Sequence, residues 1–458
     1  MSEVVGILGA GAMGRGIAQI AAVAGCEVLL ADANPGAATV AKDFVADMLR
    51  RAAEKGRMSA ADAEAAIARI AIVDGVKDFG RCTTVVEAIV ERLDVKRQVF
   101  AELEDVVAED CILASNTSSL SVTAIAAATK RPERVAGFHF FNPVPLMKVV
   151  EVVRATLTAD WVMDRLVALA RAMGHRPVVT RDTPGFLVNH AGRAFNTEGL
   201  RILGEGIADF HDVDDVMREA AGFRMGPFEL MDLTGMDVSQ PVMESIYRQF
   251  YDEPKYRPSP IATNQLAAGI LGRKTGRGFY TYDKGEQKRP APRPVPEALP
   301  RAVWARAARP EIRELVAKLA AGHGVAVEEG ASPSADAVIV LSPVGKDATT
   351  AAVEGGFDPR RTVAIDPLFG ISSRRTLMTT PVTAAAVRDA AHALFAADGV
   401  AVTVIHDSPG FIAQRVVAMI VNIACDIAQQ RIATPEDIEA AVKLGLGYPK
   451  GPLEFGDS

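Results

Sequence analysis

The chain has 458 residues, of which 49% are hydrophobic and 23% are charged, so it can bury sizeable cores and is not a disordered, collagen-like or disulfide-scaffold protein. Its 50 basic and 57 acidic residues give a formal net charge of −7, which provides no overall basic field for nucleic acid. The four cysteines form no CxxC pair, which argues against a structural zinc site. We expect two to four domains, a cytoplasmic location, no metal, and no nucleic-acid or membrane partner.

The chain opens with a motif that is typical of dinucleotide-binding proteins. Apolar residues 4–8 predict a strand, which is followed by three glycines in the spacing GxGxxG: Gly9, Gly11 and Gly14. These glycines allow a tight turn, close approach to a pyrophosphate, and packing of the helix predicted over 13–24. Asp32 follows the next predicted strand, 26–31, where its carboxylate can bind the adenosine ribose and repel the extra phosphate of NADP. We predict an NAD site that also includes Ala12 and Met13.

Two further apolar runs predict strands that end in polar residues. The first, 84–90, ends at Glu91, and Lys96 follows shortly after it. The second, 111–114, leads into a cluster of small polar residues at 115–119. In a doubly wound sheet, ligands bind at the carboxyl ends of the strands. We expect most hydroxyls of this cluster to cap the helix predicted over 122–128, and one or two to face a substrate.

The candidate catalytic pair lies on two apolar runs that flank a proline-rich turn. Glu151 lies within the run 149–153, and a carboxylate there needs a partner to offset its desolvation. His139, on the neighbouring run, is the obvious partner. A buried carboxylate bonded to one imidazole nitrogen fixes the tautomer and leaves the other nitrogen free as a general base, as alcohol oxidation requires. The alternative is a core histidine that a backbone carbonyl satisfies.

Six sequence motifs resemble those of the L-3-hydroxyacyl-CoA dehydrogenases. They are GAGAMG, VVEAIVE, SNTSSL, HFFNPVPLMKVVEV, DTPGFLVN and GRKTGRGFY, and they cover residues 1 to about 283. The resemblance implies an α/β Rossmann-type NAD-binding domain, an all-α helical domain, and oxidation of a (3S)-3-hydroxyacyl-CoA with NAD as the acceptor. An NAD-dependent dehydrogenase of a free hydroxy acid on the same fold is the alternative, and a non-enzymatic binding protein is disfavoured.

The same resemblance assigns roles to individual side chains. His139 would be the base and Glu151 its partner. The residues placed against the substrate are Ser118 and Asn189, at the 3-oxygen or thioester, and Lys55, near the CoA phosphates. The further residues placed against the cofactor are Glu91, Lys96, Asn116, Ser118, Asn142 and Lys274. His190 stands where the family usually has arginine, a departure that leaves Asn189 in place.

The second half of the chain repeats part of the first. DTPGF at 182–186 aligns with DSPGF at 407–411, an offset of 225 residues. The same offset pairs Asp212 with Asp437, Gly222 with Gly447, Gly226-Pro227 with Gly451-Pro452, Glu229 with Glu454, and Asp232 with Asp457. We infer a duplicated helical domain. Strands predicted over 337–341, 362–365 and 400–405 indicate a degenerate Rossmann-like copy before it.

This second copy lacks the chemistry of the first. No GxGxxG motif precedes its strands, Asp366 lies near the position of His139, Thr376 falls opposite Glu151, and Gln414 replaces Asn189. We therefore expect one active site per chain. The second copy would either cover the helical domain within the chain or provide an oligomer surface, and we expect a homodimer.

These patterns divide the chain into five parts. They are an NAD-binding domain (1–183), a helical substrate and dimerisation domain (184–283), a proline-rich linker (284–304), a degenerate Rossmann-like domain (305–405) and an incomplete second helical domain (406–458). This layout is similar to that of bacterial 3-hydroxybutyryl-CoA and 3-hydroxyadipyl-CoA dehydrogenases. The resemblance therefore favours a short-chain or dicarboxylyl acyl group on the CoA substrate.

Overall fold

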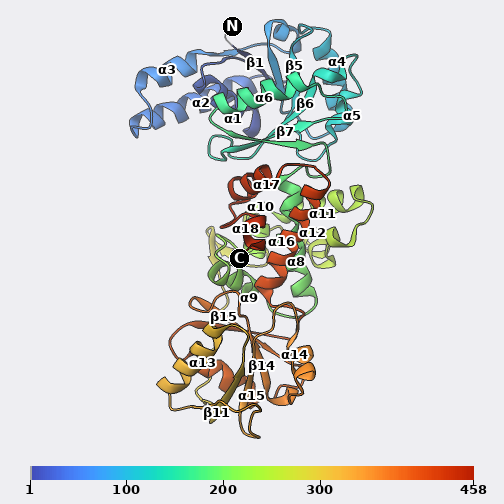
Figure 1. Ribbon diagram of the computed structural model, residues 1–458. Helices are drawn as coiled ribbons and strands as arrows, with labels where there is room; N and C mark the ends of the chain where they lie inside the picture. Colours follow the sequence, from blue (N-terminus) through green and yellow to red (C-terminus); the bar gives the residue numbers. More distant parts are fainter. Residues whose placement is uncertain (1–2, 458) are drawn as a thin grey trace. The chain divides into compact units, whose positions relative to one another are not determined.

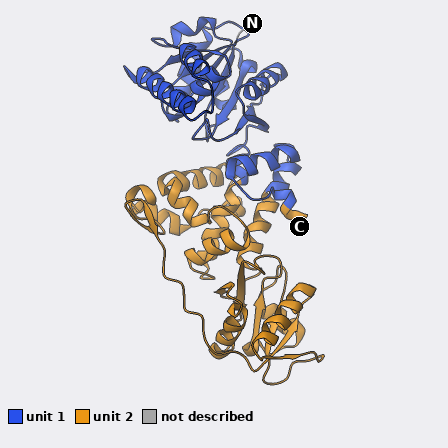
Figure 2. Cartoon of the chain, turned by 90° about the vertical axis from the view of Figure 1, so that its left-hand side faces the viewer, with its two compact units in different colours: residues 1–191, 424–454 blue, residues 192–423, 455–458 orange. Residues whose placement is uncertain are grey.

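The computed structural model describes residues 3–457, which form two compact units. Unit 1 comprises the chain up to residue 191 together with residues 424–454, and unit 2 comprises residues 192–423 and the end of the chain (Figure 2). The C-terminal segment 424–454 thus belongs to the same unit as the N-terminal sheet.

Unit 1 is built on an eight-stranded sheet in the order β3-β2-β1-β4-β5-β6-β7-β8 (Figure 1). The strands are β1 (Val4–Leu8), β2 (Glu27–Ala31), β3 (Ile70–Ile72), β4 (Thr84–Glu87), β5 (Ile112–Ser115), β6 (Val135–Phe140), β7 (Val149–Arg154) and β8 (Arg176–Arg181). Neighbouring strands are parallel except for β6 and β7, which are antiparallel. This order confirms the Rossmann-like sheet that the glycine motif predicts.

Helices cover both faces of this sheet. They are α1 (Ala12–Val23), α2 (Ala37–Glu54), α3 (Ala60–Ala68), α4 (Leu93–Glu104), α5 (Val122–Ala126), α6 (Asp160–Ala172) and the short α7 (Val188–Ala191), with 3-10 turns η1 (Val76–Arg81) and η2 (Pro132–Arg134). Val5 and Ile7 of β1 join the apolar core under α1 and α6, whereas Val4 and Leu8 join the core under α4 and α5. Alternate strand residues therefore fill two cores, as a sheet buried on both faces requires.

The C-terminal segment covers the outer edge of strand β8. Here α17 (Pro435–Ala441) leads into the π-helical turn η7 (Val442–Leu446). Asp437 accepts hydrogen bonds from Arg176 Nη2 and from the Val179 N–H, both at 3.0 Å. The Arg181 N–H donates to the Ile432 carbonyl at 3.0 Å. An open edge strand can pair with another chain. By covering the edge of β8, this segment prevents such pairing and closes the sheet.

The first part of unit 2 is helical. Its elements are α8 (Arg193–Gly204), α9 (Phe210–Asp215), the π-helical turn η3 (Val216–Ala220), α10 (Pro227–Thr234), α11 (Met236–Gln249), α12 (Pro260–Ala267), the 3-10 turns η4 (Pro254–Tyr256) and η5 (Arg273–Thr275), and a hairpin of β9 (Thr281–Asp283) and β10 (Glu286–Lys288). Asp214 accepts the N–H groups of Phe228 and Glu229 at the start of α10, and Tyr280 Oη donates to it. Burial nevertheless raises the pKa of Asp214 well above its usual value. This agrees with the helical domain expected after the first sheet.

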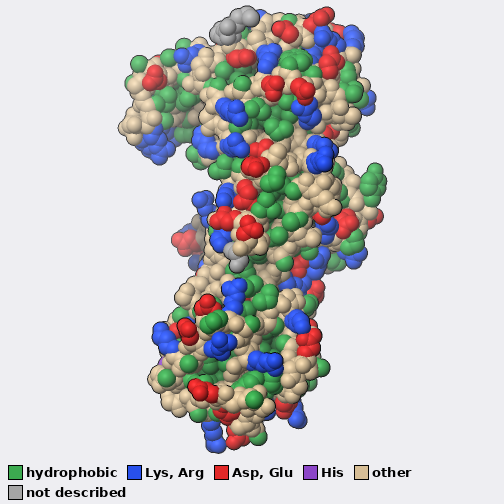
Figure 3. Space-filling model, in the orientation of Figure 1, with side chains coloured by type: hydrophobic (Ala, Val, Ile, Leu, Met, Phe, Trp, Pro, Cys, Tyr) green, Lys and Arg blue, Asp and Glu red, His purple; other side chains and the backbone are tan. Residues whose placement is uncertain are grey.

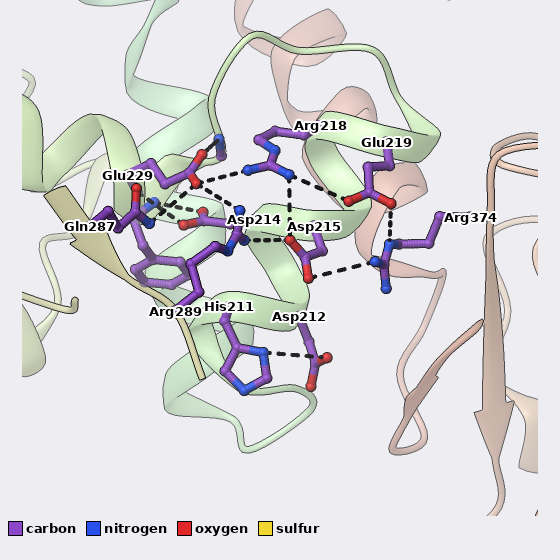
Figure 4. Close-up of polar contacts among 12 residues, drawn as sticks. His211, Asp212, Asp214, Asp215, Arg218, Glu219, Glu229, Gln287, Arg289 and Arg374 are labelled. Carbon is purple, nitrogen blue, oxygen red and sulfur yellow. Dashed lines mark hydrogen bonds and ion pairs between the residues drawn. The ribbon is translucent and has the colours of Figure 1, made fainter. Parts of the chain in front are cut away.

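An ion-pair cluster lies beside this buried carboxylate (Figure 4). Its cations are Arg218, Arg289 and Arg374, and its anions are Asp215, Glu219 and Glu229. Arg289 directly follows the β9-β10 hairpin, and Arg374 begins a strand of the second sheet. The cluster therefore joins the helical part of unit 2 to its sheet.

The second sheet has six strands in the order β12-β11-β13-β14-β15-β16. They are β11 (Ala302–Arg306), β12 (Ala326–Glu328), β13 (Val338–Leu341), β14 (Thr362–Ile365), β15 (Arg374–Thr379) and β16 (Ala401–Ile405), with helices α13 (Pro310–Gly322), α14 (Ala348–Gly355) and α15 (Ala385–Ala396) and the 3-10 turn η6 (Pro359–Arg361). Only β14 and β15 pair antiparallel within this sheet.

Two helices complete the chain, α16 (Ile412–Gln429) and α18 (Pro452–Gly456). By length and composition, α16 is the one helix among residues 3–457 that could cross a membrane, but half of its apolar window is buried within the protein. A core helix passes the same test. The helix therefore gives only weak evidence for a membrane span.

Several elements differ from those predicted. Strand β4 ends at Glu87 rather than at Val90. The range 284–304, predicted to be a linker, contains β10 and the start of β11. Strand β15 escapes prediction because Arg375, 2% exposed, lies within it. Arg375 is paired with Asp398, and its hydrogen bonds lower the pKa of Asp398 to about 2. A buried arginine that is paired inside the fold thus makes a strand look like a polar segment in the sequence.

Candidate active site

The glycine turn between β1 and α1 leaves open space where a phosphate could bind. Gly9 has a φ of +105°, and a Cβ there would lie 2.4 Å from the Ala88 carbonyl oxygen. A Cβ on Gly14 would lie 1.7 Å from the Gly9 carbonyl oxygen. A Cβ on Gly11 would meet no described atom within 4 Å. Helix α1 begins immediately after Gly11 with no acidic residue in its first turn, so its N–H groups and dipole favour an anion there.

Asp32 lies beside this turn, directly after β2. Its Oδ2 accepts the Ala10 N–H at 2.7 Å, and its Oδ1 accepts the Asn34 N–H at 2.8 Å and Asn34 Nδ2 at 3.0 Å. The carboxylate is thereby held at the carboxyl edge of the sheet, next to the space above Gly11. These residues fit the pyrophosphate and adenosine ribose of NAD. Asn34 was missed, although an Asp-x-Asn sequence is typical of such a local turn.

His139 and Glu151 form a buried pair across two antiparallel strands. The β6-β7 register places them directly opposite each other. His139 Nδ1 lies 2.5 Å from Glu151 Oε2, and the two residues are 4% and 0% exposed. Glu151 Oε1 accepts the Leu187 N–H at 2.9 Å and the Val188 N–H at 2.7 Å. Because Nδ1 faces the carboxylate, Nε2 is the imidazole nitrogen suited to act as a base.

Glu91 organises the polar loop after β5. Its Oε1 accepts Thr117 Oγ1 at 2.7 Å, the Ser118 N–H at 2.9 Å and the Ser119 N–H at 3.1 Å. Burial raises the pKa of Glu91, but these hydrogen bonds and the charge of Lys96 outweigh burial, so the net pKa lies below the usual value. Most hydroxyl groups of this loop were expected to cap the helix at 122–128. That expectation is wrong, because the loop's hydroxyl groups donate hydrogen bonds to the Glu91 carboxylate instead.

The cap of α5 is provided from elsewhere. Ser121 Oγ accepts the Ala124 N–H, and Asp182 accepts the N–H groups of Val122 and Thr123. The loop at 117–119 is therefore free of a capping function and is shaped by Glu91. The aspartate of the DTPGF motif thus has a structural task at the start of this helix.

Lys96 is buried behind the same loop. It is 1% exposed, and its Nζ lies 2.6 Å from Glu87 Oε1 and 3.3 Å from Glu91 Oε2. Ser115 Oγ donates to Glu87 Oε2 at 2.7 Å. Lys96 therefore joins two carboxylates that support the loop. Glu87 was missed because it was taken as an interior residue of a longer strand.

The other predicted residues lie in different places. Asn116 Oδ1 accepts the Phe140 N–H at 2.8 Å and so joins β5 to β6. Asn142 follows β6 and lines the cavity described below. Asn189 lies in α7, one residue after the Val188 N–H that Glu151 binds. Lys274 lies in unit 2, where its Nζ is 2.5 Å from Asp237 Oδ1. The contact of Lys274 with the cofactor stays a prediction.

A cavity of about 540 Å³ opens beside α1 in unit 1. Its lining includes five cationic residues, Arg15, Arg51, Lys55, Arg57 and Lys148. None of the described residues that line it is acidic. The Arg15 guanidinium lies 3.8 Å from the centre of the Phe44 ring. Lys and Arg side chains gather near the tip of the α2-α3 hairpin (Figure 3). The cavity therefore suits a polyanionic ligand, and of the five cations only Lys55 was predicted.

Comparisons with known proteins define the class of this protein. The family model "3-hydroxyacyl-CoA dehydrogenase, NAD binding domain" matches residues 4–183, and the model of the C-terminal domain of the same enzymes matches residues 185–282 and 410–458. The chain therefore belongs to the 3-hydroxyacyl-CoA dehydrogenase family, and it is an NAD-dependent oxidoreductase. This confirms the resemblance seen in the sequence.

Individual relatives span the full chain or its first part. The chain is 36% identical over 456 residues to 3-hydroxyadipyl-CoA dehydrogenase of Escherichia coli K12, covering 99% of this chain and 90% of the relative. It is 40% identical over 284 residues to human mitochondrial hydroxyacyl-coenzyme A dehydrogenase, covering 61% of this chain and 90% of the relative. The crystal structure of 3-hydroxybutyryl-CoA dehydrogenase from E. coli K12 matches with a TM-score of 0.86 and 34% identity, covering 100% of this chain and 91% of that one.

Proposed function

We propose that this enzyme oxidises (3S)-3-hydroxyacyl-CoA to 3-oxoacyl-CoA, with His139 as the catalytic base. The buried His139–Glu151 pair beside a glycine turn that fits NAD is the observation that carries the proposal. A histidine whose second nitrogen is held by a carboxylate is suited to remove the proton of a hydroxyl group. The same pair serves the reverse reaction, because the imidazolium then returns the proton to the oxygen.

The chain's own residues divide the work of this reaction. His139 Nε2 accepts the proton of the 3-hydroxyl group, and Glu151 stabilises the imidazolium that forms. NAD, which the glycine turn and Asp32 would hold, would supply the acceptor for the hydride from C3. Ser118, on the loop that Glu91 holds, and Asn189, in α7, would donate to the forming carbonyl or the thioester oxygen. Asn116, Asn142, Lys96 and Lys274 are proposed to support or contact the cofactor, as the family resemblance implies.

The basic cavity beside α1 is our candidate for the phosphate-bearing part of CoA. Its cations come from three segments: Arg15 from α1, residues 51–57 from the end of α2 and the turn after it, and Lys148 from the turn before β7. Asn142, which is proposed to face the cofactor, also lines the cavity. The cavity therefore places five cations near a residue that is proposed to face the cofactor, within a single unit. This arrangement favours a CoA thioester over a free hydroxy acid.

Reversing the charge of two cavity residues should weaken binding of CoA thioesters selectively. In the variant Arg51→Glu/Lys55→Glu, we expect the KM for acetoacetyl-CoA to rise about tenfold or more at low salt, because cations that face phosphates become anions. The KM for acetoacetyl-N-acetylcysteamine, which lacks those phosphates, should change less than about twofold. Steady-state assays with NADH measure both values.

The control for this experiment is Lys318→Glu/Arg388→Glu, which makes the same change in net charge on α13 and α15 of the second sheet. A similar rise in both variants would contradict a local phosphate site. Turnover of a free 3-hydroxy acid at a rate similar to that of its CoA thioester would overturn the CoA proposal itself. The same assay over C4 to C16 thioesters and 3-hydroxyadipyl-CoA tests the short-chain or dicarboxylyl preference, which a strong C16 preference would refute.

We further propose that the second half of the chain is a degenerate copy of the first. Asp182 and Asp407, 225 residues apart, each accept N–H groups at the start of a helix, α5 and α14 respectively. Asp214 and Glu439, at the same offset, accept N–H groups at the start of α10 and α18. The second sheet has the strand order of the first with two fewer strands. These shared contacts support a duplication, with the five domain boundaries given above.

The second copy holds an altered counterpart of the catalytic pair. The Asp366 N–H donates to the Thr376 carbonyl across β14 and β15, as expected for the positions of His139 and Glu151. Gln414 Nε2 donates to Asp366 Oδ1 at 2.9 Å. Among the described residues, neither Asp366 Oδ2 nor Thr376 Oγ1 finds a hydrogen-bond partner. With no base and no glycine turn, this copy supports one NAD site per chain, and a second stoichiometric site in calorimetry would refute this.

Asp366 should make the stability of the protein depend on pH. Burial raises the pKa of Asp366 to about 6, so the folded state binds its proton more tightly than the unfolded state does. The contribution of Asp366 to the free energy of unfolding is therefore greatest at low pH and is lost as pH rises through 6, by about 2 kcal/mol between pH 4.5 and 8. Asp366→Asn should melt at a higher temperature than the parent at pH 8, with a smaller advantage at pH 4.5. Differential scanning calorimetry measures both, with exposed Asp336→Asn as the control, and an equal advantage at both pH values would contradict the expectation.

The homodimer and the cytoplasmic location stay predictions. Within unit 1 the β8 edge is covered by the chain's own residues 430–446. A dimer would therefore use a different surface from this edge. Light scattering coupled to size-exclusion chromatography distinguishes a monomer from a dimer.

A further inference from the structure

We infer that Gly445, in the C-terminal segment of unit 1, is a positioning residue for the catalytic pair. The inference rests on the proposed roles of His139 and Glu151. It assigns a task in catalysis to a residue that lies far from the glycine motif and from every predicted site residue in the sequence. Because glycine has no side chain, Gly445 leaves room for the active-site backbone beside it to stay in its catalytic position.

Gly445 packs against the two segments that Glu151 joins. A Cβ on Gly445 would lie 3.0 Å and 3.1 Å from the two methyl carbons of Val188, and 3.4 Å from Val149 Cγ1. Val188 is the residue whose N–H donates to Glu151 Oε1, and Val149 lies two residues before Glu151 on the same strand. The turn η7 therefore packs against the side chain of the residue that donates to Glu151 and against a valine two residues before Glu151.

The segment that carries Gly445 is hydrogen-bonded to strand β8, which is the neighbour of β7. Asp437 binds Arg176 and the Val179 N–H, and Ile432 accepts the Arg181 N–H, all on β8. Strand β8 pairs with β7 so that Val178 lies opposite Glu151. Since these hydrogen bonds hold the segment just before η7, we expect a side chain added at Gly445 to displace Val188.

A displacement at Val188 reaches the reaction centre by two short routes. Glu151 Oε1 is bonded to the Val188 N–H, and its Oε2 lies against His139 Nδ1, so the carboxylate transmits the shift to the imidazole. Asn189, proposed to bind the substrate, is the next residue in α7. The contacts of 3.0 and 3.1 Å require Val188 to move by a few tenths of an ångström, a shift that we expect to misalign the catalytic group without unfolding the site.

The variant Gly445→Ala tests this inference directly. Gly445 does not have a left-handed φ, so alanine is compatible with the backbone and acts through its Cβ alone. We expect kcat for acetoacetyl-CoA with NADH to fall about tenfold, while the dissociation constant for NADH changes less than about twofold. The matched control is Gly322→Ala at the end of α13, where a Cβ meets no described atom within 4 Å and activity should stay at the parent level.

Two further variants separate positioning from a general loss of stability. Val188→Ala removes the methyl groups that the new Cβ would meet, so Gly445→Ala/Val188→Ala should recover kcat relative to Gly445→Ala. In a Glu151→Gln background, Gly445→Ala should cause a smaller further loss than in the parent, because the route through the carboxylate is gone and only the route through Asn189 remains. A fall in kcat that is equal in both backgrounds, or that Val188→Ala does not relieve, would overturn the inference.

The outcomes also distinguish this inference from the proposed function. If His139→Gln and Glu151→Gln keep normal turnover, the proposed catalytic pair is wrong. If those variants lose turnover while Gly445→Ala matches the parent enzyme in kcat, the catalytic pair stands and the positioning role of Gly445 is refuted.

Discussion

Replacing His139 with glutamine is expected to lower kcat for acetoacetyl-CoA reduction at least about thousandfold. A positioned general acid-base group contributes about 10² to 10⁴, and Glu151 is left with no imidazolium to stabilise. The dissociation constant for NADH should stay within about twofold of the parent value, because the glycine turn and Asp32 form a separate set of contacts. Stopped-flow absorbance at saturating NADH measures the first value, and fluorescence titration measures the second.

The control for this experiment is His323→Gln, which changes a histidine at the end of α13 whose Nδ1 lies 3.0 Å from the Leu319 carbonyl oxygen. This variant should keep the parent kcat. A residual kcat within tenfold of the parent in His139→Gln, with NADH still bound, would show that another group removes the proton. Glu151→Gln should lower kcat by a smaller factor than His139→Gln, since it leaves the base in place and removes only the stabilisation of its charged form.

The second large effect is expected at Gly14. A Cβ there would lie 1.7 Å from the Gly9 carbonyl oxygen, so Gly14→Ala forces the turn and α1 apart. We expect loss of measurable NADH binding together with a fall of several kcal/mol in unfolding free energy, because backbone atoms cannot yield as flexible side chains do. Isothermal calorimetry with NADH and thermal melts of the same samples measure the two effects.

Gly11→Ala is the matched control for this change. Its Cβ would meet no described atom within 4 Å, so the melting temperature should stay near that of the parent. NADH affinity should nevertheless fall about tenfold or more, since the methyl group occupies the space that the pyrophosphate needs. A normal affinity in Gly11→Ala would contradict the proposed phosphate position, and an unchanged melting temperature in Gly14→Ala would contradict the packing.

The first sheet and its chemical pair were accessible from the sequence because they rest on local patterns. The glycine spacing reports a backbone requirement of the turn itself, and Asp32 follows the next apolar run. Glu151 was recognised because a carboxylate in a run of valines requires a partner, and the structure places His139 opposite it. In each case the physical reason is contained within a short stretch of sequence.

Features that depend on distant contacts were not accessible in this way. Glu87 was missed because it is satisfied inside the fold by Lys96, so no local pattern marks it as a residue of the site. The cations of the basic cavity come from three separate segments, and only the fold brings them together. The role of residues 430–446 was also hidden, because the 225-residue repeat predicts a helical copy but not the strand that it covers.

The covering of β8 has a consequence for synthesis of the chain. Residues up to 191 of unit 1 leave the ribosome before the segment 424–454 that completes the unit. At translation rates of about 5 to 20 residues per second, the delay is roughly 10 to 50 s. During that time the edge of β8, and Val188, whose N–H donates to Glu151, are not covered by the segment 424–454. The newly made N-terminal sheet therefore depends on a segment that is made more than 200 residues later for protection against pairing with other chains.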